Sequence, residues 1–305
     1  TTYKAKGVLP EDDPLAIGGA GLSPKADTVV LPLLQRSDCI VLAGYDPIEM
    51  RVGWRNPWPA DAPVIEFSAV AATHGMHAAR HSFVGNVAAG LAALGSGLAP
   101  HPVWPDGLAA ASREALRAKF AAGGEWGPAQ AFATVRAVLP ADTIATADSG
   151  AHRILLSQMW SCPAPRTLLQ SSGLCTMGCA LPLGMGAKLA APERPVVVFV
   201  GDAGLEMVLG ELATLRDLGL PLIVVVLVDR SLALIEMKQR RSGLANRGVD
   251  FEGTDFSAVA AAFGGVGAVA DSAATLTEAL DGALHRNKFT LISCVIGRRA
   301  YDGTF

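Results

Sequence analysis

The 305-residue chain is half hydrophobic and 17% charged with a net charge of −3, so it can bury a large core and has no basic excess for nucleic acid. Its longest apolar runs, at 195–200 and 220–228, are shorter than the roughly 20 residues that span a bilayer, and no membrane segment is predicted. The five cysteines form no Cys-x-x-Cys pair, which favours reduced thiols in the cytoplasm over a disulfide framework or zinc site.

The first half of the chain is predicted to alternate short buried strands with helices. Residues 1–24 are rich in Gly and Pro and are expected to form a lead-in loop. The elements expected after it are a helix at 28–35, strands at 38–44 and 64–68 on either side of a proline-rich loop, and helices at 86–98 and 108–122. Gly123-Gly124 would end the last helix, which predicts a domain boundary there.

The second half repeats the alternation more strongly. Strands are expected at 143–147, 196–200, 222–228 and 290–296, and helices at 128–139, 151–160, 177–190, 205–218, 232–240, 255–263 and 273–285. Strands that alternate with helices favour parallel sheets. We therefore predict an α/β fold of two doubly wound, parallel-sheet (Rossmann-like) domains, residues 1–123 and 124–305.

Acidic residues stand where two of the buried strands end. The run 196–200 leads into Gly201-Asp202-Ala203-Gly204, and the run 222–228 leads into Asp229. Carboxyl ends of parallel strands meet at one edge of a sheet, where open α/β folds bind ligands. Two carboxylates beside a turn of small residues suit a hard divalent cation that holds a phosphate. The alternative, in which both acids only cap helices, stays open.

These motifs resemble those of a known family. Gly201-Asp202-Ala203, followed by Asp229 after 27 positions, resembles the diphosphate–metal motif of thiamine-diphosphate enzymes. The loop 173–182, Gly-Leu-Cys-Thr-Met-Gly-Cys-Ala-Leu-Pro, is similar to that of the acetolactate-synthase-like branch. Segments 7–12 and 44–49 resemble the central domain of the same branch, so the resemblance covers essentially the whole chain.

The resemblance implies thiamine diphosphate and Mg²⁺ as cofactors. Mg²⁺ would be held by the carboxylates of Asp202 and Asp229 and by the backbone carbonyl of Ser231, in an oxygen site completed by the diphosphate. Other cofactor contacts are implied for Ser149, Gly150, His152, Gly201, Ala203, Gly204 and Leu232. The amides of Ala203 and Gly204 would receive diphosphate oxygens at a helix N-terminus.

Two further residues are implied to hold the reactive end of the cofactor. Met177 matches the wedge that keeps the cofactor bent, and the carbonyl of Cys175 matches the acceptor for the pyrimidine amino group. The implied chemistry is addition of the C2 ylid to a 2-oxo acid, loss of CO₂, and protonation or transfer of the carbanion. The expected enzyme is thus a decarboxylase or carboligase, a lyase or transferase.

Three positions depart from the family pattern. Ala203 replaces a Gly, which is tolerable if its φ is negative. Asp229 replaces an Asn and adds a negative charge that Mg²⁺ or Arg230 could offset. Cys175 also replaces a Gly, with less effect if only its carbonyl is used. The family's FAD-binding pattern is not matched at 44–47, so FAD is not expected.

The resemblance includes only the central and diphosphate-binding domains. In family members, the glutamate that activates the aminopyrimidine lies in a further, N-terminal domain. We therefore expect a partner chain, either a separate small subunit or a cleaved N-terminal piece, in an α2β2 or larger cytoplasmic assembly. The alternative is a cofactor-binding but catalytically silent regulatory or assembly subunit. A nicotinamide-dependent dehydrogenase is disfavoured, because no Gly-x-Gly-x-x-Gly follows a strand with an acid about twenty residues on.

The sequence contains only a few residues that indicate the kind of substrate. The apolar run Leu232-Ala233-Leu234 indicates room for an uncharged substrate side chain, whereas Glu236 could pair with a cationic group or face solvent. His74, His77 and His81 are spaced as on one helical face. No acid or cysteine accompanies them, so a structural role is favoured over a metal site.

Overall fold

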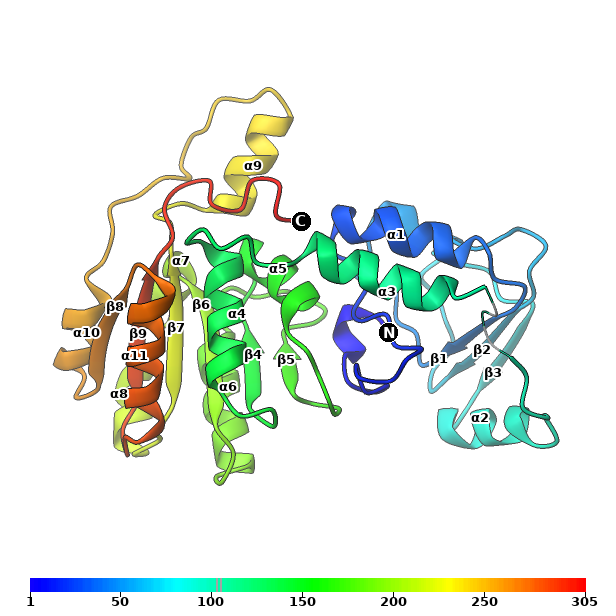
Figure 1. Cartoon of the computed structure of the whole chain (residues 1–305), viewed down its shortest axis with the longest axis horizontal. Helices are drawn as coiled ribbons and strands as arrows, with labels where there is room; N and C mark the ends of the chain where they lie inside the picture. Colours follow the sequence, from blue (N-terminus) through cyan, green and yellow to red (C-terminus); the bar gives the residue numbers. More distant parts are fainter. Residues whose placement is uncertain (103, 105) are drawn as a thin grey trace.

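The computed structural model describes residues 1–102, 104 and 106–305. The described chain contains two parallel sheets flanked by helices, one at each end of an elongated molecule (Figure 1). The predicted α/β class with two parallel-sheet domains is therefore confirmed. The boundary predicted near residue 123 remains a prediction.

The larger sheet has six parallel strands in the order β5-β4-β6-β7-β9-β8. The strands are β4 (Ile144–Ala147), β5 (Leu168–Gln170), β6 (Val196–Gly201), β7 (Ile223–Val228), β8 (Val266–Ala270) and β9 (Thr290–Val295). The strand order reverses direction around β4 and β6, which run into loops at the same edge. Open parallel sheets bind ligands at such a point.

Alternate residues of β6 enter two different hydrophobic clusters, so both faces of the larger sheet are covered. Val197 and Phe199 pack with residues of α4, α5 and α11, whereas Val198 and Val200 pack with residues of α6, α7, α8 and α10. These helices are α4 (Pro128–Val138), α5 (Ala151–Met159), α6 (Ala180–Ala190), α7 (Asp202–Glu206), α8 (Glu211–Asp217), α10 (Phe256–Ala262) and α11 (Ala273–Leu284). A strand buried on both faces must be apolar throughout, which explains the continuous valine run.

The smaller sheet has three parallel strands in the order β1-β2-β3. Its strands are β1 (Ile40–Ala43), β2 (Val64–Ser68) and β3 (His81–Val84), and its helices are α1 (Pro24–Leu34), α2 (Val87–Gly95) and α3 (Leu108–Lys119). Single 3₁₀ turns lie at Tyr3–Ala5 and Val52–Trp54. Helices α1 and α3 pack side by side (Figure 1). Helix α2 lies on β2, where Gly90 leaves room for the Phe67 ring.

The two halves share one hydrophobic cluster. Ala26 of α1 and Leu116 of α3, with Phe120 just beyond α3, belong to the same buried cluster as Phe132 of α4 and Trp160. Burial of this apolar surface ties α1 and α3 to the larger sheet.

Several element boundaries differ from the prediction. Helix α1 begins at Pro24 and not at 28, because the Ser23 hydroxyl accepts the Ala26 amide at 3.1 Å and Pro24 occupies the first turn. The helix predicted at 205–218 is two helices, α7 and α8, separated at 207–210. Helix α6 begins at Ala180 and not at 177, after Gly178 with φ +83°. Strands β3, β5 and β8 were not predicted, because they are short or built partly of Gly and Ala.

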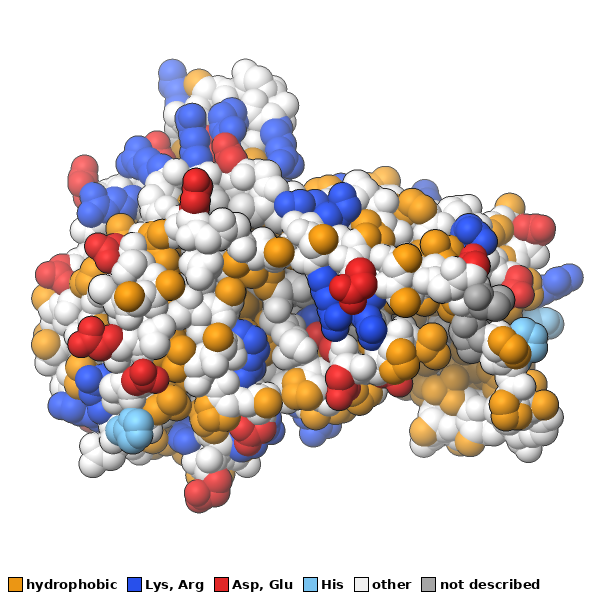
Figure 2. Space-filling model, in the orientation of Figure 1, with side chains coloured by type: hydrophobic (Ala, Val, Ile, Leu, Met, Phe, Trp, Pro, Cys, Tyr) orange, Lys and Arg blue, Asp and Glu red, His pale blue; other side chains and the backbone are white. Residues whose placement is uncertain are grey.

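Helix α9 (Ala233–Arg241) stands off the carboxyl edge of the larger sheet (Figure 1). Basic side chains gather over it (Figure 2), and its last turn contains Lys238, Arg240 and Arg241. Within the described residues, no helix combines the length and apolar character needed to cross a membrane.

Candidate functional site

A cavity of about 370 Å³ opens where β4, β6 and β7 end. The three strands are neighbours in the sheet, so the loops that follow them meet above one edge. All twelve residues predicted for the site line this cavity: Ser149, Gly150, His152, Cys175, Met177, Gly201, Asp202, Ala203, Gly204, Asp229, Ser231 and Leu232. The structure thus brings together residues spread over more than eighty positions of sequence.

Asp202 links the ends of β6 and β7. Its Oδ1 accepts the Ala203 amide at 2.8 Å, and its Oδ2 accepts the amides of Asp229 at 3.1 Å and Arg230 at 2.7 Å. Asp229 Oδ1 in turn accepts the Ser231 amide at 3.1 Å. Both carboxylates are therefore oriented by backbone donors on adjacent loops, which is the preorganisation that a cation site requires.

The two carboxylates are buried, at 3% exposure for Asp202 and 5% for Asp229. Burial and, after it, the charge of the nearby Asp202 together raise the pKa of Asp229 to about 7. Burial also raises the pKa of Asp202 above its ordinary value, against three backbone donors that lower it. Two adjacent buried acids repel each other, and a divalent cation between them would relieve that repulsion.

Asp148 is a third acid at a strand end and was not predicted for the site. It is fully buried after β4, and its Oδ2 accepts the Gly178 amide at 2.9 Å. A Cβ at Gly204 would lie only 2.2 Å from that Oδ2. Gly204 is therefore required by the close approach of α7 to Asp148. Asp148 follows a buried strand, as Asp202 and Asp229 do. This position is the sequence signal that could have identified it.

His152 lies in the first turn of α5, and its ring is enclosed by two glycines. A Cβ would lie 2.7 Å from its Cε1 at Gly150 and 3.5 Å from the same atom at Gly201. Burial lowers the pKa of His152 to about 4, so the ring is neutral at pH 7. Among the described residues, neither its Nε2 nor the buried Ser231 Oγ has a hydrogen-bond partner. Both residues line the cavity, and buried polar atoms without partners are uncommon enough to call for an explanation.

The loop that contains Cys175 and Met177 forms another wall. The carbonyl oxygen of Cys175 accepts the Ser149 hydroxyl at 2.5 Å. Cys175 has φ +50°, a left-handed conformation that suits the glycine it replaces. Ala203, by contrast, lies within helix α7, so its replacement of glycine leaves the backbone unstrained. Met177 is half-buried against the cavity.

A buried ion pair between Arg153 and Glu49 contacts the Cys175 loop and fixes its position. Arg153 Nη2 lies 2.9 Å from Glu49 Oε2, and its Nη1 donates to Cys175 Sγ at 2.7 Å. Glu49 Oε1 also accepts the Gly173 amide at 2.6 Å, and Tyr3 donates to the same carboxylate. Glu49 and Arg153 were not predicted, because their pairing joins positions 104 residues apart.

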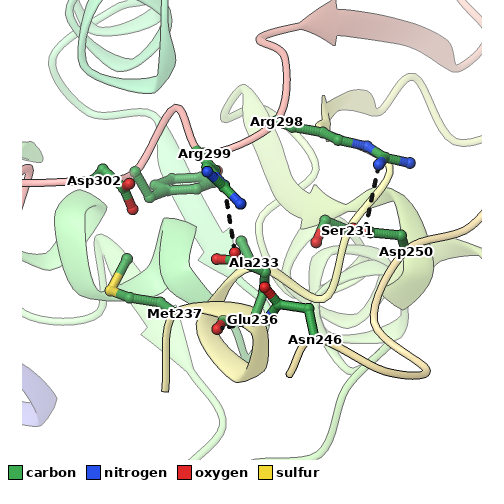
Figure 3. Close-up of a pocket in the computed structure, with 10 residues that line it drawn as sticks. Ser231, Ala233, Glu236, Met237, Asn246, Asp250, Arg298, Arg299 and Asp302 are labelled. Carbon is green, nitrogen blue, oxygen red and sulfur yellow. Dashed lines mark hydrogen bonds and ion pairs between the residues drawn. The ribbon is translucent and has the colours of Figure 1, made fainter. Parts of the chain in front are cut away.

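The segment after Asp229 divides between two cavities. Leu232, Ala233 and Leu234 line the site, as the apolar pattern suggested. Glu236 instead lines a neighbouring cavity of about 280 Å³ (Figure 3). The expectation of a solvent-facing Glu236 is wrong, because it is 6% exposed and pairs with Arg240 at 3.0 Å and Arg299 at 3.4 Å. Its pairing with a cationic group of a substrate stays a prediction.

Arg230 lies outside the cavity, whereas Tyr301 lies in its wall. Arg230 is not among the residues that line the cavity, and its guanidinium packs against Gly253. Tyr301, from the C-terminal segment, lines both cavities and is buried. No local sequence pattern predicts Tyr301 as a site residue, because only the path of the chain after β9 brings it to the cavity.

Comparison with known proteins finds one family match and several relatives that share the same cofactor or activity in their names. Residues 148–294 match the thiamine pyrophosphate enzyme, C-terminal TPP-binding domain. The chain is 30% identical over 170 residues to the thiamine pyrophosphate-containing protein YdaP of Bacillus subtilis (56% of this chain, 30% of YdaP). It is 29% identical over 242 residues to the acetolactate synthase isozyme 1 large subunit of Escherichia coli (78% of this chain, 42% of that protein).

A third relative covers the largest part of the chain among these. The catabolic acetolactate synthase of Raoultella terrigena is 28% identical over 260 residues, which are 83% of this chain and 46% of that protein. The chain therefore spans less than half the length of these curated relatives.

Proposed function

We propose that this chain, which belongs to the acetolactate-synthase-like family of thiamine-diphosphate-dependent enzymes, is the part of a 2-oxo acid decarboxylase or carboligase that anchors the cofactor. The observation that carries the proposal is the cavity at the ends of β4, β6 and β7, with its buried acid pair and its unpartnered His152 and Ser231 atoms.

The donor set fits a magnesium diphosphate. Asp202 and Asp229 supply hard carboxylate oxygens, and the Ser231 carbonyl follows Asp229 on the loop after β7. The first turn of α7, with Ala203 and Gly204, faces the same cavity and suits a diphosphate oxygen. The unpartnered Ser231 Oγ and His152 Nε2 would contact the bound group.

The remaining residues would orient the cofactor and exclude water. We propose that Met177 holds the cofactor bent and that the carbonyl of Cys175 accepts a hydrogen bond from its amino group. That oxygen already accepts the Ser149 hydroxyl and has a second lone pair to offer. When bound, the cofactor would supply an acidic carbon that adds to the ketone of a 2-oxo acid and takes up electrons as CO₂ leaves. Leu232 to Leu234 would favour an uncharged substrate side chain.

The group that activates the aminopyrimidine is proposed to come from outside these 305 residues. Among the described residues, no glutamate lines the cavity. We propose a separate small chain or a cleaved N-terminal piece as its source, in a heteromer of α2β2 type or larger. Five free cysteines support a cytoplasmic location.

A catalytically silent subunit that binds the cofactor for assembly or regulation is the second candidate. Only the source of the activating glutamate separates it from the first. Co-expression with the segment that supplies this glutamate should yield decarboxylation of a 2-oxo acid for an enzyme, and none for a silent subunit.

Cofactor binding by the isolated chain can be measured directly. Thiamine diphosphate with Mg²⁺ should raise the melting temperature of the chain, because ligands that bind only the native state stabilise it. Asp202→Ala should reduce the affinity for Mg²⁺ and thiamine diphosphate by about 100-fold or more. Asp229→Asn should change it by less than about 10-fold, since Asn keeps a ligand oxygen and removes a buried charge. Calorimetric titration measures both.

The matched control is Asp217→Ala, an exposed acid that pairs with Arg216 on the surface. It should bind the cofactor as the parent chain does. Equal affinities in the parent chain and Asp202→Ala would contradict the proposed function. NAD should leave the melting temperature of every variant unchanged.

A further inference from the structure

A cluster of side chains that could ligate a metal lies on β2 of the smaller sheet and on the loop that follows this strand. The smaller sheet is at the opposite end of the molecule from the larger sheet (Figure 1). It contains Glu66, His74 and His77, whose ligand atoms all lie within 4.8 Å of one another. His81, expected on the same helical face as the other two histidines, is instead exposed on β3. The expectation that no acid accompanies the histidines is therefore wrong, since β2 brings Glu66 to them.

The sheet orients the carboxylate of this cluster. Glu66 lies opposite Ser82 in the β2–β3 register, and the Ser82 hydroxyl donates to Glu66 Oε2 at 3.0 Å. The other oxygen, Oε1, lies 2.9 Å from His77 Nε2. The Glu66 and His77 side chains are 3% and 1% exposed. Among the described residues, no lysine or arginine pairs with Glu66, although buried carboxylates are usually paired with a cation or bound to a metal.

The histidines leave nitrogen atoms without partners. His74 Nε2 and His77 Nδ1 are buried and lack a hydrogen-bond partner within the described part of the chain. The two rings lie together, with centroids 4.6 Å apart, and Tyr45 packs on His77 at 5.4 Å with its buried hydroxyl also unpartnered. The His74 ring thus adjoins the Glu66–His77 pair with a buried nitrogen that the described protein groups leave without a partner, which is the situation expected of a ligand-binding atom.

We propose that Glu66, His74 and His77 bind a divalent transition-metal ion such as Zn²⁺. Two imidazoles and one carboxylate match Zn²⁺, Ni²⁺ or Cu²⁺ and not Mg²⁺ or Ca²⁺, which prefer oxygen ligands alone. A tetrahedral ion with ligand distances of about 2.0–2.1 Å spaces its ligands by roughly 3.4 Å. The 2.9 Å separation of His77 and Glu66 is near this spacing, and water would complete the shell.

His74 would have to change its protonated nitrogen before it could bind the metal. Its Nδ1 accepts the Met76 amide at 3.0 Å, so its Nε2 bears the proton in the neutral ring. Ligation through Nε2 moves that proton to Nδ1 and releases the Met76 amide. Gly75, with φ +65°, adjoins both residues in an exposed loop and allows this turn to change.

The experiment is a Zn²⁺ titration of the whole chain by calorimetry with Mg²⁺ in excess, so that the Asp202–Asp229 pair does not compete. A Cys39→Ser background removes the exposed thiol. We expect saturable binding of one Zn²⁺ per chain, weakened at least 10-fold by His74→Asn and by Glu66→Gln. Co²⁺ in place of Zn²⁺ should give the visible absorption of a four-coordinate nitrogen–oxygen site, lost in the same variants.

His101→Asn is the matched control, because His101 is exposed and outside the cluster. It should bind Zn²⁺ as the background chain does. Because Glu66 is buried and its substitution could disturb folding, His74→Asn in the half-exposed loop decides the outcome if Glu66→Gln does not fold. An absence of saturable binding, or binding unchanged in His74→Asn, overturns the proposal and leaves water as the occupant.

Discussion

Individual residues around the cofactor cavity adopt backbone conformations that are costly for their side chains. Glu49, Cys175 and Arg230 have φ values of +72°, +50° and +55°, in the left-handed region that costs a non-glycine residue about 1–2 kcal/mol. Each is held there by hydrogen bonds to the site: Glu49 to Gly173, Cys175 to Ser149, and Arg230 to Asp202. Such local strain is typical of positions that a functional site over-determines.

Gly204 is the residue at which one methyl group should matter most. In Gly204→Ala the added Cβ meets Asp148 Oδ2 at 2.2 Å, so α7 or Asp148 must shift. We expect a loss of about 1–3 kcal/mol in unfolding free energy, measured by urea denaturation, and weaker binding of thiamine diphosphate with Mg²⁺. Ala203→Gly in the same helix is the control and should cost about 1 kcal/mol or less.

His152 and Asp229 should make stability depend on pH in opposite directions. The pKa of His152 falls to about 4 in the folded chain, so the unfolded chain takes up its proton first. Stability from this group is therefore lost as pH falls from about 6.5 to about 4. The pKa of Asp229 rises to about 7, so its contribution is lost as pH rises from about 4 to about 7.

Single substitutions separate the two slopes. In Asp229→Asn without Mg²⁺, unfolding free energy should rise with pH between about 4 and 6.5, by on the order of 1–3 kcal/mol. In His152→Gln it should fall over the same range. Urea denaturation at pH 4.5, 5.5 and 6.5 provides the measurement, with exposed His101→Gln as control. Identical pH profiles for the two variants would be inconsistent with these pKa shifts.

At the scale of elements, buried polar contacts join loops that hydrophobic packing alone would leave free. Arg153 on α5 contacts Glu49, Gln170 and Cys175, and thereby ties the smaller sheet's loop to β5 and to the cavity wall. Helix α9 is held in a similar way, since Arg299 of the C-terminal segment pairs with Glu236 (Figure 3). The shape of the cavity therefore depends on ion pairs between distant segments.

Glu49→Gln should show how much the Glu49–Arg153 ion pair contributes to the free energy of unfolding. Its side chain is 13% exposed and that of Arg153 is 6%, so the change leaves a largely buried guanidinium unpaired. We expect a loss of about 3 kcal/mol in unfolding free energy, measured by denaturant titration. Arg36→Gln breaks an exposed pair of similar length, with Asp106 at 3.0 Å, and should cost less than about 1 kcal/mol. Equal losses in the two variants would argue against a clamp at Glu49.

At the scale of the whole molecule, one buried cluster runs from α1 and α3 into the larger sheet. We therefore expect the described chain to unfold in a single transition. Tryptophan fluorescence, which includes Trp54 and Trp58 of the first half, should coincide with far-ultraviolet circular dichroism. Phe120→Ala should lower the stability of both halves together by about 3–5 kcal/mol. Two separate transitions would show that the halves are independent.

The sequence pattern by itself determined the fold class and placed two acids at strand ends, whereas the other site candidates followed from the family resemblance. Continuous apolar strands that end in Gly-Asp-Ala-Gly and in Asp229 are local signals, and a parallel sheet aligns strand ends by construction. Strand β5 was missed because three residues are too few to show a period, and β8 because its Gly and Ala residues give a weak hydrophobic pattern.

Only the tertiary structure decided which distant charges meet. The pairing of Glu49 with Arg153, the burial of Glu236 between two arginines, and the approach of Glu66 to His74 and His77 join residues by folding and not by spacing. A charged residue has the same local pattern whether it is solvated or buried, because its environment comes from elements elsewhere in the chain. For that reason the histidines near residue 77 looked structural in sequence and form a candidate metal site in the fold.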